Sequence, residues 1–511
     1  MREMPLPDVG LGAMILRRAA LVPDLPAISF EGETLRYAAF GQRIRRLAGA
    51  LRKAGVNRGD RVAFLGHNHP VFLETLFAAT AIGAIFVPLN FRLTGPELEF
   101  IINDAGVHTL LVDDAHKAVI DAIRGALCCR HYLAAESACG AWTGLEGFVA
   151  HVVPLAAAER VEADDVALIM YTSGTTGRPK GAMLTHGNIF WNNVNARFGP
   201  ENFAGDVSLT AAPLFHIGGL NVTTLIGLQG GGHVVLHRSF DPALVLEDIA
   251  RYRVTTMFGA PAMFLFMAQH PGFAGADLSS VDILICGGAP VPEALLRAYQ
   301  ARGIRLCQGY GLTETAPFAS FLGSRWIGSK LGSAGQPPLY GDVRVVDAQN
   351  HPLTHGERGE VCVRAPNVMK GYWNRPEATR EAIDPEGWFH TGDVGYFDAD
   401  GFLYLCDRVK DMVITGGENV YPAEVESVLY EHPAIAEVAV IGLPDEKWGE
   451  AVTAVVRPVP GGTLTLEELR SFAGEKLARY KLPLRLHLVD EMPRNPAGKV
   501  LKYQLRELLN T

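Results

Sequence analysis

Short apolar runs alternate with longer helix-like segments from residue 60 to about residue 400. The runs have the length of strands, and the segments between them are long enough to form helices. The clearest runs are 61–65, 109–113 and 282–286, and the helical segments that follow them are 73–82, 118–127 and 292–302. Strands that alternate with helices pair in parallel as βαβ units, so the pattern predicts a large α/β body.

The pattern changes after Asp400, where a smaller α+β unit is expected. Pro422 begins a helix whose apolar face carries Val425 and Leu429, and Pro433 ends it. A strand at 437–441, a helix at 464–478 and a strand at 486–489 complete the unit. Its length of roughly a hundred residues is normal for a domain. The charged stretch 407–411 is the expected joint, which gives domains 1–407 and 408–511.

The composition is that of a multidomain globular enzyme. A chain of 511 residues is too long for one ordinary core. Hydrophobic residues make up 48% and charged residues 20% of the chain. The net charge of −9 argues against a nucleic-acid partner, because such a partner calls for a basic face.

The sequence also bears on location and redox state. The longest apolar run, 76–89, is shorter than the ~20 residues of a membrane-spanning helix, so it is expected in the core. Charged residues interrupt the N-terminal segment, which argues against a secretory signal and for a cytoplasmic protein. Peripheral membrane contact and oligomerisation stay open. Seven cysteines without a Cys-x-x-Cys pair are expected to be reduced, mostly buried thiols, with neither disulfides nor a zinc site.

The segment 171–181 is the most informative in the chain. It follows the apolar run 166–170 and contains three glycines, five hydroxyl or phenol side chains, and the cations Arg178 and Lys180. Glycines let the backbone approach an anion, while hydroxyls, amide N–H groups and cations bind phosphate oxygens. Gly177 and Lys180 are not adjacent, so this is not a Walker A loop. A strand followed by a phosphate-binding loop is predicted.

Four further clusters carry chemistry, and each is weak alone. The segment 213–219 places His216 in an apolar, glycine-rich setting, where a satisfied core histidine is the simpler interpretation. In 308–315, Thr313 can donate to phosphate and Glu314 is a hard oxygen ligand suited to Mg²⁺, although a capped helix start would look similar.

The other two clusters lie nearer the C-terminus. Asp393 in 390–395 and Arg408 offer a carboxylate and a guanidinium for a ribose, although Gly-Asp turns are common. Lys499 follows a proline- and glycine-rich turn, a place where an exposed lysine usually has no role.

Together, and in this order, the clusters resemble the adenylate-forming superfamily of acyl- and aryl-CoA synthetases, luciferases and adenylation domains. The resemblance covers essentially the whole chain. The segments 416–426 and 443–449 look most like bacterial fatty-acyl and aryl-CoA synthetases. It implies an α/β fold with a large multi-sheet N-terminal body and a small, mobile α+β C-terminal domain.

The resemblance implies a reaction in two halves. A carboxylate attacks the α-phosphate of ATP to give acyl-AMP and pyrophosphate, and the thiol of CoA then displaces AMP. The residues implied to hold the β- and γ-phosphates are Thr172, Ser173, Gly174, Thr175, Thr176 and Lys180. Thr313 is implied to hold the α-phosphate, and Glu314 the Mg²⁺. Lys499 is implied to bridge the acid and the α-phosphate, and His216 is implied to be a catalytic residue as well.

The remaining implied roles concern the nucleoside, CoA and domain movement. The residues expected around adenine are Gly288, Ala289, Pro290, Gln308, Gly309, Tyr310 and Gly311, with Tyr310 stacking on the ring. Asp393 and Arg408 are implied to bind the ribose. The small domain is implied to rotate about Lys410 between the half-reactions, which brings Gly416 and Gly417 to the pantetheine arm.

The acid is expected to be an uncharged-tail monocarboxylate. The stretches 216–232 and 255–266 contain no Asp, Glu, Arg or Lys, and a pocket without fixed charge disfavours amino acids and dicarboxylates. The residues expected to line it are Ile217, Gly218, Leu220, Val222, Phe258, Met263 and Phe264. A fatty acid is the main expectation. An aryl acid of the cinnamate, ferulate or benzoate type, a carrier-protein acceptor, and a non-catalytic ATP-binding module are the alternatives.

Overall fold

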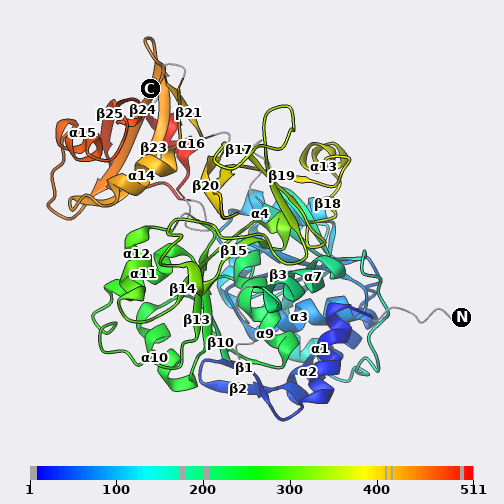
Figure 1. Cartoon of the computed structure of the whole chain (residues 1–511). Helices are drawn as coiled ribbons and strands as arrows, with labels where there is room; N and C mark the ends of the chain where they lie inside the picture. The colour runs from blue at the N-terminus through cyan, green and yellow to red at the C-terminus, as the bar shows by residue number, and fades with distance from the viewer. Residues whose placement is uncertain are drawn as a thin grey trace, which may run out of the picture.

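The structure is a computed structural model, and it describes residues 8–172, 179–199, 207–289, 291–408, 411–415, 418–494 and 500–509. The side chains of residues 407, 408, 418 and 419 are not among those described. Figure 1 shows a large body, coloured blue to yellow, and a smaller C-terminal unit in orange and red. The expected division into a large and a small part is thus confirmed.

Two mixed sheets form most of the body. Over the described residues the first has eight strands in the order β15-β14-β13-β12-β10-β11-β1-β2, and the second has eight in the order β18-β9-β8-β4-β3-β5-β6-β7. The first sheet contains β1 (Pro26–Phe30), β2 (Glu33–Arg36), β10 (Val207–Thr210), β11 (His233–Leu236), β12 (Thr256–Gly259), β13 (Ile283–Gly287), β14 (Leu306–Gly311) and β15 (Phe318–Leu322). The second contains β3 (Arg61–Leu65), β4 (Ile85–Leu89), β5 (Val107–Val112), β6 (His131–Ala134), β7 (Thr143–Gly144), β8 (Val166–Thr172), β9 (Lys180–Thr185) and β18 (Gly371–Tyr372). Most neighbouring pairs in both sheets are parallel, as the alternation of strands and helices predicts.

Helices connect these strands. The longer ones are α1 (Leu11–Leu21), α2 (Tyr37–Lys53), α3 (Pro70–Ala81), α4 (Gly95–Ala105), α7 (His186–Arg197), α10 (Pro242–Tyr252), α11 (Pro261–Gln269) and α12 (Glu293–Gln300). The shorter ones are α5 (Lys117–Ile123), α6 (Leu145–Val149), α8 (Ile217–Gly219), α9 (Leu225–Gly230) and α13 (Pro376–Ala382), with the π-helix η3 (Leu220–Thr224). Single 3-10 turns are η1 (Asp114–His116), η2 (Arg124–Ala126), η4 (Thr313–Thr315), η5 (Ser324–Trp326) and η6 (Arg479–Lys481).

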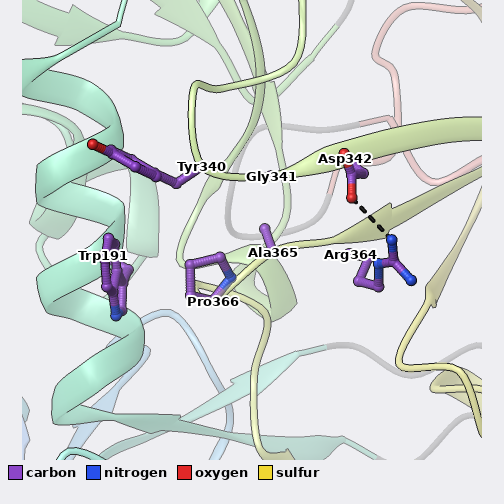
Figure 2. A pocket seen from close by; sticks show the side chains of 7 residues that line it. All are labelled: Trp191, Tyr340, Gly341, Asp342, Arg364, Ala365 and Pro366. Carbon is purple, nitrogen blue, oxygen red and sulfur yellow. Dashed lines mark hydrogen bonds and ion pairs between the residues drawn. The ribbon is translucent and has the colours of Figure 1, made fainter.

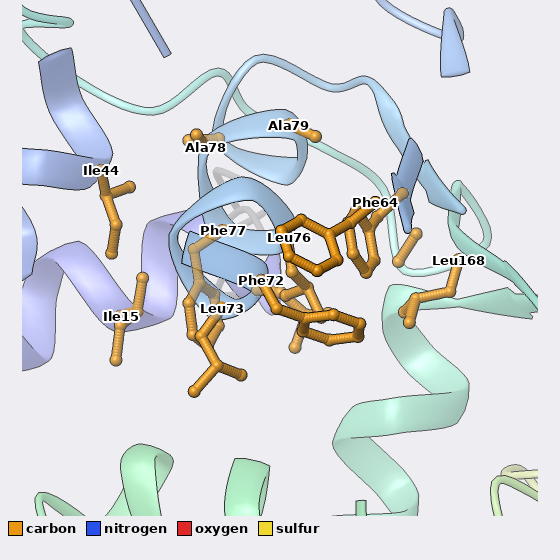
Figure 3. Packing of buried hydrophobic residues seen from close by; sticks show 14 of the residues in the cluster. Ile15, Ile44, Phe64, Phe72, Leu73, Leu76, Phe77, Ala78, Ala79 and Leu168 are labelled. Carbon is orange, nitrogen blue, oxygen red and sulfur yellow. The ribbon is translucent and has the colours of Figure 1, made fainter. Parts of the chain in front are cut away.

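Helix α3 is the centre of the largest core. It begins at Pro70, where the preceding His69 accepts a hydrogen bond from the Val71 N–H, and all twelve of its residues are buried. Figure 3 shows Phe72 of α3 toward Phe64 of β3, with 5.4 Å between the ring centres, and Ile44 of α2 on the other side of the helix. The apolar run 76–89 is therefore core, as expected from its length. Among the described residues, no helix is long and apolar enough to cross a membrane.

The alternation of strands and helices ends earlier than the sequence pattern predicts. From β16 (Asp342–Val346) onward, through β17 (Gly359–Arg364), β19 (Phe389–Phe397) and β20 (Leu403–Arg408), the neighbouring strands are antiparallel. Strands β19 and β20 are joined by a tight turn in which Asp398 accepts from the N–H groups of Asp400 and Phe402 and Gly401 has φ +77°. A connection this short permits only antiparallel pairing.

The C-terminal unit has its own sheet and core. Its strands are β21 (Val413–Thr415), β22 (Glu418–Val420), β23 (Ile435–Asp445), β24 (Gly449–Pro458) and β25 (Arg485–Leu488), and its helices are α14 (Pro422–Leu429), α15 (Leu466–Gly474) and α16 (Lys502–Leu509). The strand expected at 437–441 is longer, because it pairs with β24 along its whole length. The helix expected at 464–478 is shorter, because a capping box between Thr465 and Glu468 sets its start and Gly474 lies at its end.

All seven cysteines are free. Cys286, Cys307, Cys362 and Cys406 are buried, whereas Cys128 and Cys139 are exposed.

Candidate active site

The phosphate side of the candidate site is built where β8 and β9 lie beside η4 and β18. Thr172 ends β8 and is paired across the sheet with Lys180, which begins β9. The Thr172 hydroxyl lies 3.4 Å from Oε1 of Glu314. We use "phosphate side" for Thr172, Lys180, Glu314 and Tyr372. The structure thus brings together three residues that the sequence analysis took from two separate motifs.

Glu314 is a buried carboxylate held by neighbouring side chains. It is 8% exposed, and the Tyr372 hydroxyl donates to its Oε1 at 3.0 Å. Burial raises the pKa of Tyr372, and the negative charge of Glu314 raises it further, so the phenol stays protonated and remains a donor. Lys180 Nζ lies 5.3 Å from the centre of the Tyr372 ring. The carboxylate and the cation are therefore placed around one aromatic side chain.

The nucleoside side lies where β14 and β19 meet. The Tyr310 hydroxyl donates to Oδ2 of Asp393 at 2.7 Å, and Asp393 is 9% exposed. Asp393 is paired with Arg408 in the register of β19 and β20. Tyr310 and Asp393 are 83 positions apart in the sequence, and this hydrogen bond links them. Two more residues expected around the nucleoside lie next to this pair: Gly311 follows Tyr310 in β14, and Arg408 is the strand partner of Asp393.

The ends of β13 and β14 run close together at the expected adenine site. Gly287 is paired with Gly309, and a Cβ placed on Gly287 would lie 2.6 Å from the Gly309 carbonyl oxygen, so a larger residue would push the strands apart. Gly288 follows with φ +82°, a conformation that favours glycine, and leads into the exposed Ala289. Gln308 is buried beside this edge, and its Nε2 has no hydrogen-bond partner among the described residues.

The acid side begins at His216, which directly precedes α8. Its Nε2 is buried and has no hydrogen-bond partner among the residues that the structure describes. Burial and, to a smaller extent, the nearby Arg92 guanidinium together lower the pKa of His216 to about 4. The imidazole is therefore neutral near pH 7, and its unpaired nitrogen can meet a ligand. The lone core histidine with satisfied hydrogen bonds, which the sequence left as the simpler interpretation, is not what the structure contains.

An aromatic wall stands next to His216. The Phe258 ring packs against the backbone of Gly218, where an added Cβ would lie 2.6 Å from the ring. The same ring lies 3.5 Å from the Cβ position of Gly287, which ends the neighbouring parallel strand β13. Val222 of η3 belongs to the apolar cluster against which Phe258 packs. We use "acid side" for His216, Gly218, Val222 and Phe258.

The other residues expected to line the acyl pocket lie deeper. Leu220 and Phe264 are fully buried, Leu220 in the core around α3 and Phe264 against Tyr299 in a second core. Ile217 and Met263 are 6% and 9% exposed and belong to the same two cores. The wall formed by Phe258 and Gly218 is thus backed by residues that pack the protein interior.

Several predicted site residues lie outside the described residues, and for them the roles remain predictions. These are Ser173, Gly174, Thr175, Thr176, Pro290, Lys410, Gly416, Gly417 and Lys499. For Arg408 the backbone is described and the side chain is not. Thr313 is half-buried at the start of η4, next to Glu314.

The sequence analysis missed Tyr372 and Arg92. Tyr372 stands in an aromatic stretch, 371–373, without a charged residue, so nothing near it in sequence points to Glu314. Arg92 lies over the rings of Phe91 and Phe215, with its guanidinium 5.2 Å and 6.0 Å from their centres. An arginine between two apolar residues in a loop gives no chemical signal by itself.

Asp113 holds two histidines that flank Phe91, one of the two rings under Arg92. It is 1% exposed and accepts from the rings of His67 and His116, at 3.2 Å and 2.6 Å, and from the backbone N–H of each. Burial by itself would raise the pKa of Asp113, but the hydrogen bonds from His116 and His67 lower it overall. The two imidazoles flank the Phe91 ring, at 4.4 Å and 5.3 Å between ring centres.

A surface hollow of about 390 Å³ lies away from these residues (Figure 2). Trp191 and Tyr340 meet edge to face at one end, and Asp342 and Arg364 form an ion pair of 3.1 Å at the other. None of the residues predicted for catalysis or ligand binding lines it. The candidate active site is therefore defined by side-chain chemistry and not by this hollow.

Comparison with known proteins identifies the family of the chain. The family of AMP-binding enzymes matches residues 15–373, and the AMP-binding enzyme C-terminal domain matches residues 424–499. The chain is 46% identical over 506 residues to a feruloyl-CoA synthase of an Amycolatopsis species, covering 97% of this chain and 98% of the relative. It is 40% identical over 508 residues to a long-chain-fatty-acid–CoA ligase of Mycobacterium tuberculosis, covering 97% and 98%.

A solved structure gives the same result for the fold. The o-succinylbenzoate CoA synthetase of Bacillus subtilis, in complex with its acyl-adenylate intermediate, matches with a TM-score of 0.85 and 33% identity, covering 97% of this chain and 98% of that chain. The chain therefore belongs to the AMP-binding enzyme family, and the resemblance drawn from its motifs is confirmed. Within that family it is an AMP-forming acid–thiol ligase that joins an acyl or aryl carboxylic acid to CoA at the expense of ATP.

Proposed function

We propose that the substrate is an aryl carboxylic acid of the cinnamate or ferulate type, converted through its acyl-adenylate to the CoA thioester. The sequence by itself favoured a fatty acid, with the aryl acid as the alternative. The alternative has more support, because the feruloyl-CoA synthase matches at 46% identity and the long-chain-fatty-acid ligase at 40%.

The observation that carries the proposal is the position of the Phe258 ring. It lies between the backbones of Gly218 and Gly287, and Gly218 comes two residues after His216, whose Nε2 has no hydrogen-bond partner among the described residues. A flat aromatic substrate can stack on or meet the edge of such a ring, which contributes roughly 0.5–1.5 kcal/mol beyond the area that it buries. A long flexible chain would have to pass the ring and the packed apolar residues beside it, Val222 among them. Phe258 therefore favours a short, planar acid.

The absence of fixed charge supports the same class. The pocket segments 216–232 and 255–266 carry no Asp, Glu, Arg or Lys, so a second carboxylate or an ammonium group on the substrate would be buried without a partner. The aromatic acid presents only one charge, its carboxylate. That group would lie toward His216 and the phosphate side.

In the mechanism that we propose, the protein chiefly positions the reactants and offsets charge. The Glu314 carboxylate, buried next to Thr172 and Lys180, is a suitable hard ligand for Mg²⁺. The ion would neutralise the charge of the ATP phosphates. Thr313 would donate to the α-phosphate, and Lys499 would stabilise the charge that develops as the acid attacks.

The nucleoside and the second half-reaction involve the remaining motif residues. Asp393, already a hydrogen-bond acceptor from Tyr310, would also accept from the ribose hydroxyls. For thioester formation we propose that the domain beginning at residue 408 rotates about Lys410. The rotation would replace Lys499 by Gly416 and Gly417 at the thiol's path, where the lack of side chains leaves room for the pantetheine arm.

The test is pyrophosphate release measured across a panel of acids. We expect kcat/KM for ferulate, cinnamate and 3-phenylpropionate to exceed that for decanoate and palmitate by at least roughly tenfold, the scale of an unfavourable fit in a hydrophobic pocket. Phe258→Ala should narrow or reverse this ratio, because it opens the route beyond Gly218.

A control separates substrate preference from loss of stability. Phe273 is a core phenylalanine that packs on Tyr299, away from the acid side, so Phe273→Ala destabilises the protein without opening the pocket. Its ratio of aryl to fatty activity should equal that of the unaltered enzyme. Higher activity of the unaltered enzyme with palmitate than with ferulate would overturn the aryl assignment and restore the fatty-acid one.

A further inference from the structure

The turn that follows Glu314 is held by buried asparagine side chains from distant parts of the chain. Asn367, which lies between β17 and β18, donates through Nδ2 to the carbonyl oxygens of Thr315 and Phe318, at 2.5 Å and 2.8 Å. The Phe318 N–H donates to Oδ1 of Asn192, on helix α7, at 3.1 Å. Both asparagines are completely buried. The turn thus depends on side chains for hydrogen bonds that regular structure would otherwise supply.

A third asparagine reaches the same turn from the acid side. Asn221 of the π-helix η3, next to Val222, donates through Nδ2 to the carbonyl oxygen of Ala316 at 2.6 Å. The backbone carbonyl oxygen of Asn221 accepts from Asn192 Nδ2 at 3.2 Å. One helical segment therefore carries the acid-side residue Val222 and reaches the Glu314 turn through Asn221.

The conformation of the turn explains why it needs this support. Ala316 has φ +61°, in the left-handed region, and is completely buried. A non-glycine residue in this region is strained and persists only where its surroundings hold it. If the hydrogen bonds to the turn were lost, its relaxation would move the adjoining η4, which carries Thr313 and Glu314.

Fold stability alone does not account for Asn221. Its Oδ1 is buried and has no hydrogen-bond partner among the described residues. An unsatisfied buried acceptor is destabilising, and it offsets the hydrogen bond that the other half of the amide makes. Leucine has a similar volume and would remove this cost, but it would leave the Ala316 carbonyl oxygen without the donor that Asn221 supplies, so the two effects on stability oppose each other.

We propose that Asn221 is a positioning residue for adenylation: it ties the acid-binding helix η3 to the turn that holds Thr313 and Glu314. The acid and the metal-binding carboxylate are thereby kept in one register, so that the acid's oxygen and the α-phosphate meet in line. Asn367 and Asn192 hold the other side of the same turn. The inference rests on the proposed adenylation chemistry.

The first test separates the two half-reactions in Asn221→Leu. We expect acid-dependent pyrophosphate release to fall at least roughly tenfold in kcat, with thioester formation from supplied acyl-AMP and CoA within about twofold of the unaltered enzyme. The melting temperature should change little, because the unsatisfied Oδ1 of Asn221 is removed while the Ala316 carbonyl oxygen loses its donor. Equal loss in both half-reactions, or unchanged pyrophosphate release, would overturn the proposal. Asn193→Leu is the matched control.

The control is a buried asparagine close to the turn that makes no direct hydrogen bond to it among the described residues. Asn193 lies on α7, is 2% exposed, donates to Oε1 of Gln229 at 2.7 Å and accepts through Oδ1 from Asn192 Nδ2 at 3.3 Å. In Asn193→Leu the Asn192 amide keeps its bonds to the Asn221 backbone and to Phe318. Both half-reactions should therefore persist in Asn193→Leu. A tenfold loss of pyrophosphate release in this control as well would show that any buried asparagine of the region matters, and it would contradict a particular role for Asn221.

The second test uses pH in Asn221→Asp. The carboxyl group has the shape of the amide, but it can donate to the Ala316 carbonyl only while it is protonated. Adenylation by this variant should therefore decrease as the pH rises through the pKa of the new carboxyl group, a titration absent from the unaltered enzyme and from Asn221→Leu. A pH profile that matches the unaltered enzyme would refute the role of the donated hydrogen bond. If the unaltered enzyme releases no pyrophosphate with any acid, it is the proposed function that fails.

Discussion

The phosphate side and the acid side of the candidate site are built on opposite plans. On the phosphate side, Glu314 already accepts hydrogen bonds from Thr172 and Tyr372. On the acid side, His216 has a buried nitrogen that is unpaired among the described residues, and it stands next to the aromatic wall of Phe258. One side is assembled before any ligand binds, whereas the other keeps bonding capacity for its ligand.

The difference follows from what each side must bind. ATP is the same in every turnover, so fixed side chains can be aimed at it in advance and need not reorganise during the reaction. The acid varies across the family, and its pocket is shaped by apolar contacts together with few polar atoms. We therefore expect substitutions on the phosphate side to change the rate, and substitutions on the acid side to change preference or pH dependence.

The largest effect is expected from Glu314→Gln. The change keeps the shape and the acceptor oxygen but removes the anionic charge that suits Mg²⁺, so pyrophosphate release should fall on the order of a hundredfold or more. Titration with Mg²⁺ should show a raised requirement. A rate equal to that of the unaltered enzyme at limiting Mg²⁺ would mean that Glu314 only starts the η4 turn.

A smaller effect is expected from Tyr372→Phe. The ring and its contact with Lys180 remain, while the hydrogen bond to Glu314 is lost. A hydrogen bond to a charged group contributes about 1.5–3 kcal/mol, and Thr172 still contacts the carboxylate, so we expect roughly a tenfold loss in kcat/KM for ATP. Tyr404→Phe, a tyrosine that stacks on Tyr396 away from the site, should have no such effect. Equal kinetics for both variants would contradict a prearranged phosphate side.

The smallest effect is expected from His216→Gln, measured as acid sensitivity. The folded-state pKa of about 4 lies below the ordinary value of 6.5. The neutral imidazole therefore contributes stability that is fully present above pH 6.5 and is lost as the pH falls from 6.5 toward 4. Replacing it with a group that does not titrate should make the melting temperature less dependent on pH in this window.

The exposed His151 provides the comparison for that measurement. His151→Gln should leave the slope of melting temperature against pH unchanged. If the melting temperature of His216→Gln depends on pH as steeply as that of the unaltered protein, the His216 imidazole is not desolvated. That result would contradict the described difference between the acid side and the phosphate side.

Much of the body could be predicted from local patterns, because strands and helices have distinct periodicities. The runs 61–65 and 282–286 are β3 and β13, within a residue at each end. The predicted βαβ alternation failed after β14, because the direction in which a strand pairs depends on the connection and on its neighbours in space. The strands between residues 342 and 408 pair antiparallel. Apolar runs alone do not show this direction, whereas the tight turn between β19 and β20 requires it for that pair.

The sequence by itself determined the family and the chemical groups of the site, since glycines, hydroxyls and Glu314 stand in fixed order along the chain. Only the tertiary structure decided which groups meet. Tyr372 reaches Glu314 across 58 positions, and Asn221 reaches Ala316 across 95. Tyrosine and asparagine are common residues, so their presence in the sequence does not indicate which residue they contact. A hydrogen bond requires a distance of about 3 Å in space, whatever the separation along the chain. Such contacts exist only once the sheets and the π-helix have packed.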